Sequence, residues 1–244
     1  MTATTVIRDG VDHRFDLALY TLAEAARALD VPASTFATWA KGYLRRPPGG
    51  QPVAGEPVVT SLEAPPGKPS VPFVGLAEGV VLAAVRRSGV PLQRIRPALE
   101  VLAREIGVAH ALASKALYTD GAEVLFDYAQ HAPHDEAEAA GGLVVVRSGQ
   151  RVFKPVIDDY LRRIEYGPDG YAQLIRLPAY ERANVLADPT RSFGQPIFAR
   201  GGGRVSDVLD RFWAGDDIHT LTQEFGVPAE EIEDVLRAAS RWAA

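Results

Sequence analysis

Residues 20–43 read Tyr20-Thr-Leu-Ala-Glu-Ala-Ala-Arg-Ala-Leu-Asp-Val-Pro-Ala-Ser-Thr-Phe-Ala-Thr-Trp-Ala-Lys-Gly-Tyr43, and this stretch decides the fold of the N-terminal half. Thr21 is a suitable helix N-cap, and Glu24 follows at the spacing of a capping box. The apolar residues that follow repeat at intervals of three and four, which predicts one helix that ends at Asp30-Val-Pro32.

A second helix is predicted from about residue 33, and Phe36, Trp39 and Ala40 form its buried side. Two short helices joined by about three residues are typical of a helix-turn-helix motif. The alternative at this point is a pair of packing helices in an all-α domain.

The residues that follow the motif are rich in proline and glycine and include a basic cluster. Residues 57–62 are predicted to form a strand, residues 65–67 a turn, and residues 70–73 the return strand. A β-hairpin behind a helix-turn-helix is a wing, and residues 34–55 contain no acidic side chain. This charge distribution suits contacts with DNA phosphates, although a solvated basic face is the alternative.

The polar face of the second helix and the wing supply the candidate DNA contacts. Hydroxyl groups on the helix suit phosphates or base edges, and the cations suit the DNA backbone or guanine. The predicted DNA-binding residues are Ser34, Thr35, Thr38, Lys41, Arg45, Arg46 and Lys68. Phe36 and Trp39 are predicted to be core residues, because they share the apolar side of the helix.

Two further helices are predicted after the wing, from Leu76 to Ser88 and from Pro91 to Gly107, with Pro97 as a kink or an effective start. The segment Val74-Gly-Leu-Ala-Glu-Gly-Val-Val-Leu-Ala-Ala-Val-Arg-Arg-Ser-Gly-Val-Pro-Leu-Gln-Arg-Ile-Arg96 spans most of this pair. Together with the motif and the wing, it resembles the winged-helix DNA-binding domain of MerR-like regulators over about residues 18–107. The ligand-binding cysteines of that family are missing, so the resemblance does not imply metal or thiol sensing.

The middle of the chain is predicted to connect two functional units. Residues 129–142 are polar and acidic and are interpreted as a linker, and residues 143–187 as a small β-containing bridge. Within the bridge, Gly167-Pro-Asp-Gly170 has the composition of a hairpin turn.

The last segment is predicted to hold three amphipathic helices, at residues 206–214, 218–225 and 228–242. Acidic residues outnumber basic ones nine to three between residues 205 and 244. The expected fold is a trihelical, helix-turn-helix-like unit, but its charge would repel phosphates. We therefore expect this unit to bind protein rather than DNA.

The segment Asp188-Pro-Thr-Arg-Ser-Phe-Gly-Gln-Pro-Ile-Phe-Ala-Arg-Gly-Gly-Gly-Arg-Val205 lies directly upstream of the three helices. With them, it resembles an antitoxin family over about residues 185–242, and the whole chain resembles a VapB-type antitoxin. The matching positions are Asp188, Pro189, Gly194, Pro196, Arg204, Val205, Gly215 and Val235. An extra glycine in Gly202-Gly-Arg204 departs from the family pattern.

This resemblance implies a PIN-domain ribonuclease toxin as partner, with a metal-dependent site lined with carboxylates. Arginine is the side chain best suited to paired binding of carboxylates. Arg191, Arg200 and Arg204 are therefore the predicted toxin-binding residues, and the alternative is that they cap helices or stay solvated.

Composition excludes several classes of protein. The 244-residue chain has no cysteine, which excludes disulfides, thiolate metal sites and cysteine nucleophiles. The first residues lack a signal-peptide pattern, and the longest apolar run, Val80–Val85, is too short for a membrane helix. We therefore expect a cytoplasmic protein without membrane contact.

The net charge of -5 conceals an asymmetry between the two halves of the chain. Residues 1–107 carry twelve basic and ten acidic side chains, whereas residues 108–244 carry fourteen and twenty-one. This difference favours different partners for the two halves.

An enzyme would need a constellation of catalytic residues, and the sequence shows none. The five histidines lack the spacing of a helical metal site, and Asp158 and Asp159 are followed four residues later by Arg162 and Arg163, as on a solvated helix face. Neither catalytic residues, a metal nor a cofactor is predicted.

The predicted fold is mainly α with small β elements. It comprises a winged helix-turn-helix domain at residues 1–128 (core 18–107), a linker at 129–142, the β bridge at 143–187 and a C-terminal trihelical domain at 188–244. The predicted function is an antitoxin that neutralises a PIN-domain ribonuclease and binds operator DNA as a homodimer to repress its own operon. The alternatives are a free-standing MerR-like transcriptional regulator with a C-terminal effector or dimerisation domain, and a scaffold that does not bind DNA.

Overall fold

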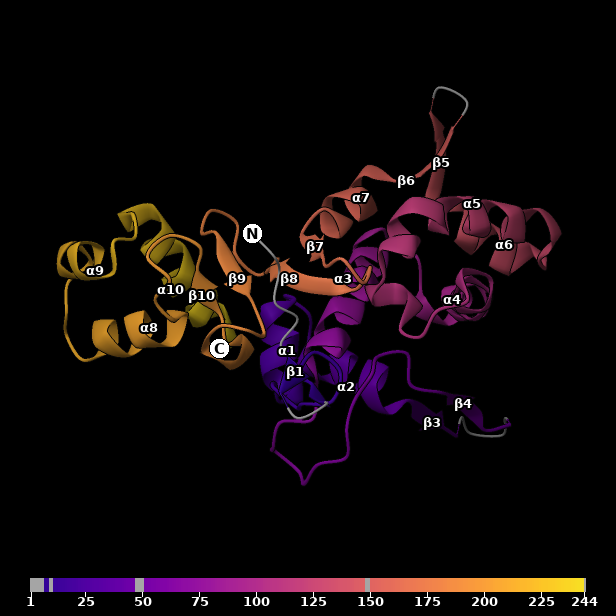
Figure 1. The fold of residues 1–244 in the computed structure, drawn as a ribbon. Helices are drawn as coiled ribbons and strands as arrows, with labels where there is room; N and C mark the ends of the chain where they lie inside the picture. The colour runs from indigo at the N-terminus through magenta and orange to yellow at the C-terminus, as the bar shows by residue number, and fades with distance from the viewer. Residues whose placement is uncertain (1–6, 9–10, 47–50, 148–149, 244) are drawn as a thin grey trace.

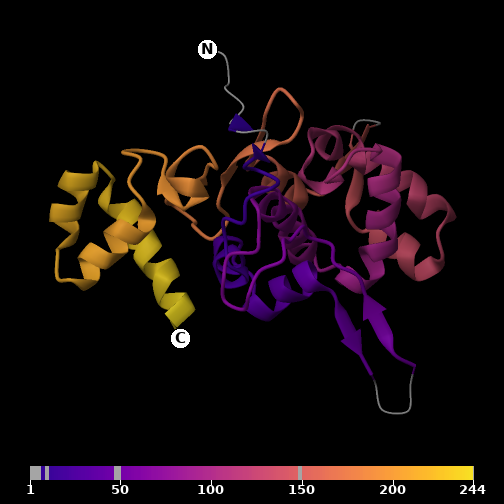
Figure 2. The same cartoon turned by 60° about the horizontal axis from the view of Figure 1, so that its bottom comes forward.

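The computed structural model describes residues 7–8, 11–46, 51–147 and 150–243. Figure 1 shows an elongated molecule, with the C-terminal helices of residues 205–243 at one end and the helices of residues 92–106, 115–131 and 134–141 at the other. The helices of residues 22–41 and 73–87 lie between these ends, and the hairpin of residues 43–45 and 53–55 projects from the body, as Figure 2 also shows. The fold is mainly helical with short strands, as predicted.

The predicted helix-turn-helix is confirmed as α1 (Leu22–Ala28) and α2 (Ala33–Lys41). The capping box is formed as the sequence indicates: the Thr21 hydroxyl accepts from the backbone N–H of Glu24, and the Glu24 carboxylate accepts from the backbone N–H of Thr21. The turn between the helices uses the left-handed conformation at Asp30, with φ of 54°. Aspartate tolerates that conformation better than most residues.

Helix α3 (Phe73–Arg87) is the central helix of the molecule, and its residues 73–85 are all buried. The helix-turn-helix packs on it closely at Gly79. A Cβ atom at this position would lie 2.6 Å from Leu29 and 2.9 Å from Phe36, both of which are fully buried. Glycine is therefore required at this position for the motif to lie directly on α3.

The wing is present, but it is not formed by the strands that the sequence predicted. Strand β3 (Tyr43–Arg45) begins directly after α2 and pairs antiparallel with β4 (Val53–Gly55). Residues 57–62 form no strand: the backbone N–H groups of Val58 and Val59 both donate to the Trp39 carbonyl. The alternation of apolar residues there reflects burial against α2 rather than strand pairing.

The predicted return strand at residues 70–73 is also wrong. Val71 forms an isolated antiparallel bridge with Tyr20, and Phe73 is already the first residue of α3. The segment returns along the start of the helix-turn-helix, because Val71 and Tyr20 are both buried there.

Helix α4 (Leu92–Ile106) continues through Pro97 and ends at Gly107, which has a φ of 70°. A 3₁₀ turn, η1 (Ala111–Ala113), and helix α5 (Lys115–His131) follow. The residues interpreted as a linker contain helix α6 (His134–Gly141), which packs against α4 and α5. Acidic residues in its first turn suit a helix N-terminus, and its apolar side consists of alanines, which explains why the sequence looked like a loop.

A hairpin of β5 (Val144–Arg147) and β6 (Gln150–Phe153) follows, and then α7 (Pro155–Leu161), which packs on α3. The next strands form one antiparallel sheet in the order β10-β9-β8-β7. Their bounds are β7 (Ile164–Tyr166), β8 (Ala172–Arg176), β9 (Val185–Ala187) and β10 (Ile197–Phe198). The predicted turn at residues 167–170 joins β7 to β8, with Gly170 at φ of 82°.

Strands β9 and β10 lie on either side of residue 188, where the sequence placed a domain boundary, and they pair directly. The segment between them contains the 3₁₀ turn η2 (Ser192–Gly194). The bridge and the C-terminal unit therefore share a sheet. The division of the chain into folding units stays a prediction.

The three predicted C-terminal helices are confirmed as α8 (Val205–Trp213), α9 (Ile218–Phe225) and α10 (Ala229–Ala243). They enclose the fully buried side chains of Val208, Leu221 and Val235. The buried carboxylate of Asp234 on α10 accepts from the backbone N–H groups of Arg182 and Ala183, which ties the trihelix to the loop before β9.

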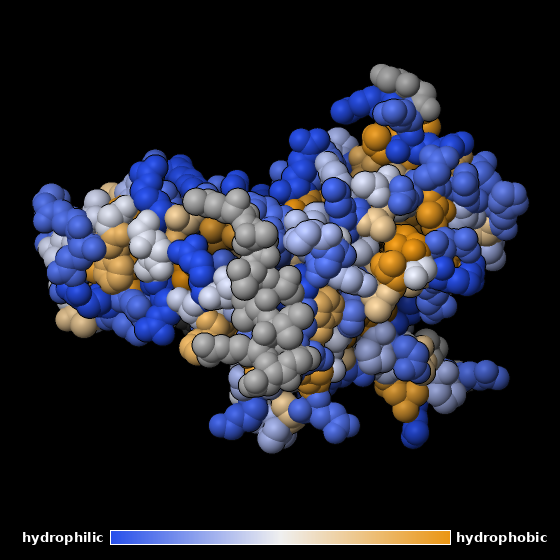
Figure 3. Space-filling model, in the orientation of Figure 1, coloured by the Kyte–Doolittle hydropathy of each residue, from blue (hydrophilic) through white to orange (hydrophobic). Residues whose placement is uncertain are grey.

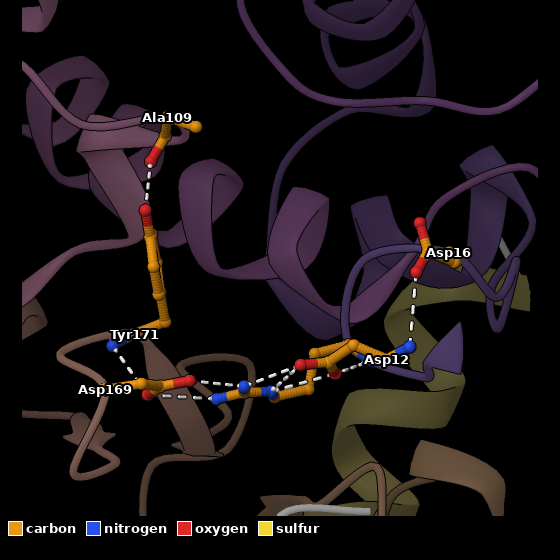
Figure 4. A network of polar contacts seen from close by, with 6 residues as sticks. Asp12, Asp16, Ala109, Asp169 and Tyr171 are labelled. Atoms are coloured by element: carbon orange, nitrogen blue, oxygen red, sulfur yellow. Dashed lines mark hydrogen bonds and ion pairs between the residues drawn. The ribbon is translucent and has the colours of Figure 1, made fainter. Parts of the chain in front are cut away.

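A polar network joins the N-terminal segment to the turn between β7 and β8 (Figure 4). The guanidinium of Arg14 contacts the carboxylates of both Asp12 and Asp169, and its hydrogen bond lowers the pKa of Asp169. Nearby, the Tyr171 hydroxyl donates to the carbonyl of Ala109 at 2.9 Å. Asp12 is the last residue of β2 (Val11–Asp12), which pairs antiparallel with β1 (Ile7–Arg8).

Candidate nucleic-acid and partner-binding sites

Helix α2 presents the hydroxyl face that the sequence predicted. Ser34 is exposed, whereas Thr35 and Thr38 are half-buried. The Thr38 hydroxyl donates to the Ser34 carbonyl at 2.8 Å, so it is partly engaged within the helix. Lys41 is exposed in the last turn of the helix, and Phe36 and Trp39 are buried on the opposite side as core residues.

The hairpin carries part of the predicted basic cluster. Arg45 pairs with Val53 in the strand register, and Arg46 follows directly and is exposed. Lys68 does not lie on the hairpin, because it belongs to the loop that leads to α3. The fold nevertheless brings Lys68 to Lys41: both line a hollow of 600 Å³ beside the N-terminal end of α1.

A second hollow, of 360 Å³, adjoins the hydroxyl face of α2. Thr35 and Thr38 line it together with Arg86 from α3 and with Gln93 and Arg96 from α4. The guanidinium of Arg96 lies 5.7 Å from the ring centre of Tyr43 and also bonds the carbonyl of Glu56. Arg96 thus contacts both chain segments of the hairpin, β3 and the residue after β4.

The sequence did not assign Arg86 and Arg96 to the DNA-binding site, although both lie in the predicted helix pair after the wing. Their proximity to α2 depends on how α3 and α4 cross the helix-turn-helix. The one local signal is the absence of acidic residues between Arg86 and Arg96.

Comparisons with known proteins agree with this geometry. Residues 18–99 match a family described as "Putative DNA-binding HTH domain". The chain is 48% identical to a protein of Mycobacterium tuberculosis named "Putative antitoxin VapB45", over 92% of this chain and 95% of that protein. The chain belongs to the VapB-type antitoxin family.

A solved structure and an uncharacterized protein, both from Mycobacterium tuberculosis, are also similar to this VapB-type protein. The X-ray crystal structure of Rv2018 has 45% sequence identity and a TM-score of 0.79, covering 91% of this chain and 99% of that one. The uncharacterized protein Rv2308 is 27% identical over 93% of this chain and 92% of its own length. The helix-rich fold with a helix-turn-helix is therefore shared with a solved relative.

The segment between β9 and α8 carries the predicted toxin-binding arginines. Arg191 and Arg200 are exposed, and neither makes an ion pair with any residue that the structure describes. Arg204 differs, because its guanidinium is held by Asp207, with an Nη2–Oδ1 distance of 3.0 Å. Arg191 lies against Gly202, so the turns at residues 188–194 and 199–204 are neighbours.

Within the described ranges, no group of three or more His, Asp and Glu side chains could hold a metal ion. Asp158 and Asp159 pair with Arg162 and Arg163, as the spacing predicted. The relationship to an antitoxin with a DNA-binding domain points to a non-enzymatic regulator.

Helices long and apolar enough to cross a bilayer are not found in the part of the chain that the structure describes. The surface in Figure 3 is largely hydrophilic, with smaller apolar areas.

Proposed function

We propose that this VapB-type protein binds and neutralises a PIN-domain ribonuclease toxin and binds operator DNA to repress its own operon. In this proposal it acts in the cytoplasm as a homodimer, because two-fold symmetry presents two recognition helices to two half-sites.

The DNA-binding part is carried by one observation: α2 and its hairpin bring hydroxyls and cations together in a segment, residues 34–55, that contains no acidic side chain. Lys41 and Lys68 line one hollow together with Glu63, and Thr35 and Thr38 line the other together with Arg86 and Arg96. The order of motif, hairpin and helix pair is also that of MerR-like domains. We propose Ser34, Thr35, Thr38, Lys41, Arg45, Arg46 and Lys68 as the DNA contacts, with the cations on phosphates.

The test measures binding to the DNA upstream of the protein's own reading frame as a function of salt. Each lost phosphate contact should reduce the salt slope by about 0.9. We expect Lys41→Ala combined with Arg45→Ala to weaken binding and to reduce the slope by about two. Arg162→Ala combined with Arg237→Ala, which removes two exposed arginines outside the proposed DNA-binding site, is the charge-matched control.

An unchanged affinity and slope in the double variant of Lys41 and Arg45 would contradict the assignment of α2 and the hairpin. Equal losses of affinity in the two double variants would show that only the total charge of the protein matters.

The toxin-binding part is supported by Arg191 and Arg200, which are exposed cations without a carboxylate partner in the described chain. Arg204 is the third proposed contact, and binding would exchange its bond to Asp207 for one to the toxin.

The experiment is joint expression and co-purification with the PIN-domain protein encoded by the adjacent reading frame, followed by a ribonuclease assay. We expect a stable complex with suppressed ribonuclease activity, and Arg191→Ala with Arg200→Ala should restore that activity. A chain that does not bind its neighbour would refute this part of the proposal.

A further inference from the structure

Phe193 is the most exposed large apolar side chain in the described part of the chain, at 80%. Single exposed apolar residues are common and need no explanation by themselves. The backbone at Phe193 is the unusual feature, because Phe193 at φ of 53° and its neighbour Ser192 at φ of 47° are both left-handed. A bulky side chain rarely adopts this strained conformation, which persists only where the surrounding structure imposes it.

The surrounding structure holds the turn at both ends. The backbone N–H of Gly194 donates to the Arg191 carbonyl at 2.9 Å, and the N–H of Gln195 donates to the Ser192 carbonyl at 3.0 Å. The hydroxyl of the buried Tyr20 donates to the Gly194 carbonyl at 2.7 Å. Gly194 is itself left-handed and buried, and a Cβ there would lie 2.6 Å from the Tyr20 hydroxyl. The core of the helix-turn-helix region thus fixes a turn that directs an aromatic ring to solvent.

The charge around Phe193 differs from that of the trihelix beyond it. Arg191 precedes the ring by two residues, and Arg200 lies on the neighbouring turn that Arg191 contacts through Gly202. Both guanidinium groups lack an ion-pair partner among the described residues. The two neighbouring turns therefore present an exposed aromatic ring and two cations without an ion-pair partner among the described residues, in a half of the chain that is acidic overall. The complement of this surface is an apolar pocket with carboxylates at its rim.

We propose that Phe193 is the anchor by which this protein docks into an apolar pocket, rimmed by carboxylates, on its toxin. This inference rests on the proposed toxin binding, and it adds the side chain that carries the affinity. A preformed aromatic anchor loses little conformational entropy on binding, and such side chains dominate many protein interfaces.

The test compares variants of the full chain for affinity to the adjacent-frame PIN-domain protein, by titration calorimetry. Phe193→Gly removes the ring and fits the left-handed backbone, so its thermal unfolding temperature should equal or exceed that of the unmodified protein. We expect its affinity to fall by about 30-fold or more. Phe193→Asn, which also tolerates this conformation, should show the same loss. Trp213→Ala removes the other strongly exposed aromatic ring, on α8, and should change affinity by less than about two-fold.

Unchanged affinity in Phe193→Gly would overturn this inference and leave the proposed toxin binding intact. A loss of self-association in Phe193→Gly, with toxin affinity retained, would assign the ring to contact between copies and would also overturn it. Failure of the unmodified protein to bind the toxin would refute the proposed function itself.

Discussion

Nδ1 of His110 lies 3.1 Å from Oε1 of Glu78, a buried carboxylate in the middle of α3. Thr60, in the loop after the hairpin, joins the pair: its backbone N–H donates to Glu78, and its hydroxyl lies 3.0 Å from His110 Nδ1. The pair therefore connects three segments, namely the central helix, the loop that supports the hairpin, and the turn after α4.

The His110–Glu78 pair should make part of the stability pH-dependent. The hydrogen bond to Glu78 raises the pKa of His110 above its ordinary value of 6.5, against the opposing effect of burial. The pair thus stabilises the fold fully below about pH 6.5, and this contribution is lost as the pH rises through the raised pKa. In urea denaturation, His110→Asn should lower the free energy of unfolding most near pH 5 and progressively less at higher pH. Asparagine is chosen because His110 has a φ of 52°.

Glu78→Gln should remove the same pH-dependent component, since it deletes the other partner. If the free energy of unfolding changed with pH in the same way in His110→Asn and in the unmodified protein, the His110–Glu78 pair would be excluded as the source of the pH dependence.

Tyr20→Phe should destabilise the protein by about 1–2 kcal/mol, because it leaves the Gly194 carbonyl without its donor in a buried site. The measurement is the free energy of unfolding from chemical denaturation. Tyr171→Phe is a matched control, since its hydroxyl also donates to a carbonyl, that of Ala109, but in an exposed position. The control should cost less, and an equal cost would argue against burial as the cause.

Asp234→Ala should lower the free energy of unfolding by about 2–4 kcal/mol, because the backbone N–H groups of Arg182 and Ala183 would lose their shared acceptor in the interior. Asp234→Asn keeps one oxygen and should cost less. Glu233→Ala changes the adjacent, half-exposed carboxylate and should stay within about 0.5 kcal/mol. A similar cost for Asp234→Ala and Glu233→Ala, by thermal or chemical unfolding, would show that the bonds to the loop contribute little.

Gly201→Ala should destabilise the protein more than Gly170→Ala, although both glycines are left-handed, with φ of 76° and 82°. A Cβ at Gly201 would lie 2.1 Å from the Phe225 carbonyl oxygen, whereas a Cβ at Gly170 would meet nothing within 4 Å. Gly170→Ala should therefore cost only the conformational strain, about 1–2 kcal/mol, and Gly201→Ala distinctly more. Equal unfolding free energies for the two variants would mean that the turn before α8 moves freely away from α9.

Local patterns in the sequence were sufficient to predict most helices and one turn. The capping box at Thr21 and Glu24, the turn at residues 167–170 and the three C-terminal helices were all predictable. Each depends on interactions within a few residues along the chain, and the residue types themselves carry that information. The ion pairs of Asp158 and Asp159 with arginines one helical turn later were predictable for the same reason.

The hairpin and α6 were not predictable in this way. Weak alternation at residues 57–62 suits a strand and equally suits a loop buried against Trp39, and only the packing of α2 decides between them. Helix α6 has an apolar side made of alanines, so its burial follows from the position of α4 and α5 and not from its own hydrophobicity.

The sequence by itself determined where the cations, hydroxyls and arginines lie along the chain, and which half is acidic. Only the tertiary structure decided which of them share a surface: Lys41 and Lys68 line one hollow, Thr35 and Arg96 line another, and Arg191 lies against Gly202. It also decided that Phe193, an ordinary apolar residue in the sequence, is exposed to solvent. The hydroxyl of Tyr20 bonds the carbonyl of the next residue, Gly194, which lies 174 positions along the chain. Such contacts join residues far apart in the chain, so no local pattern encodes them, and they form only when the segments pack together.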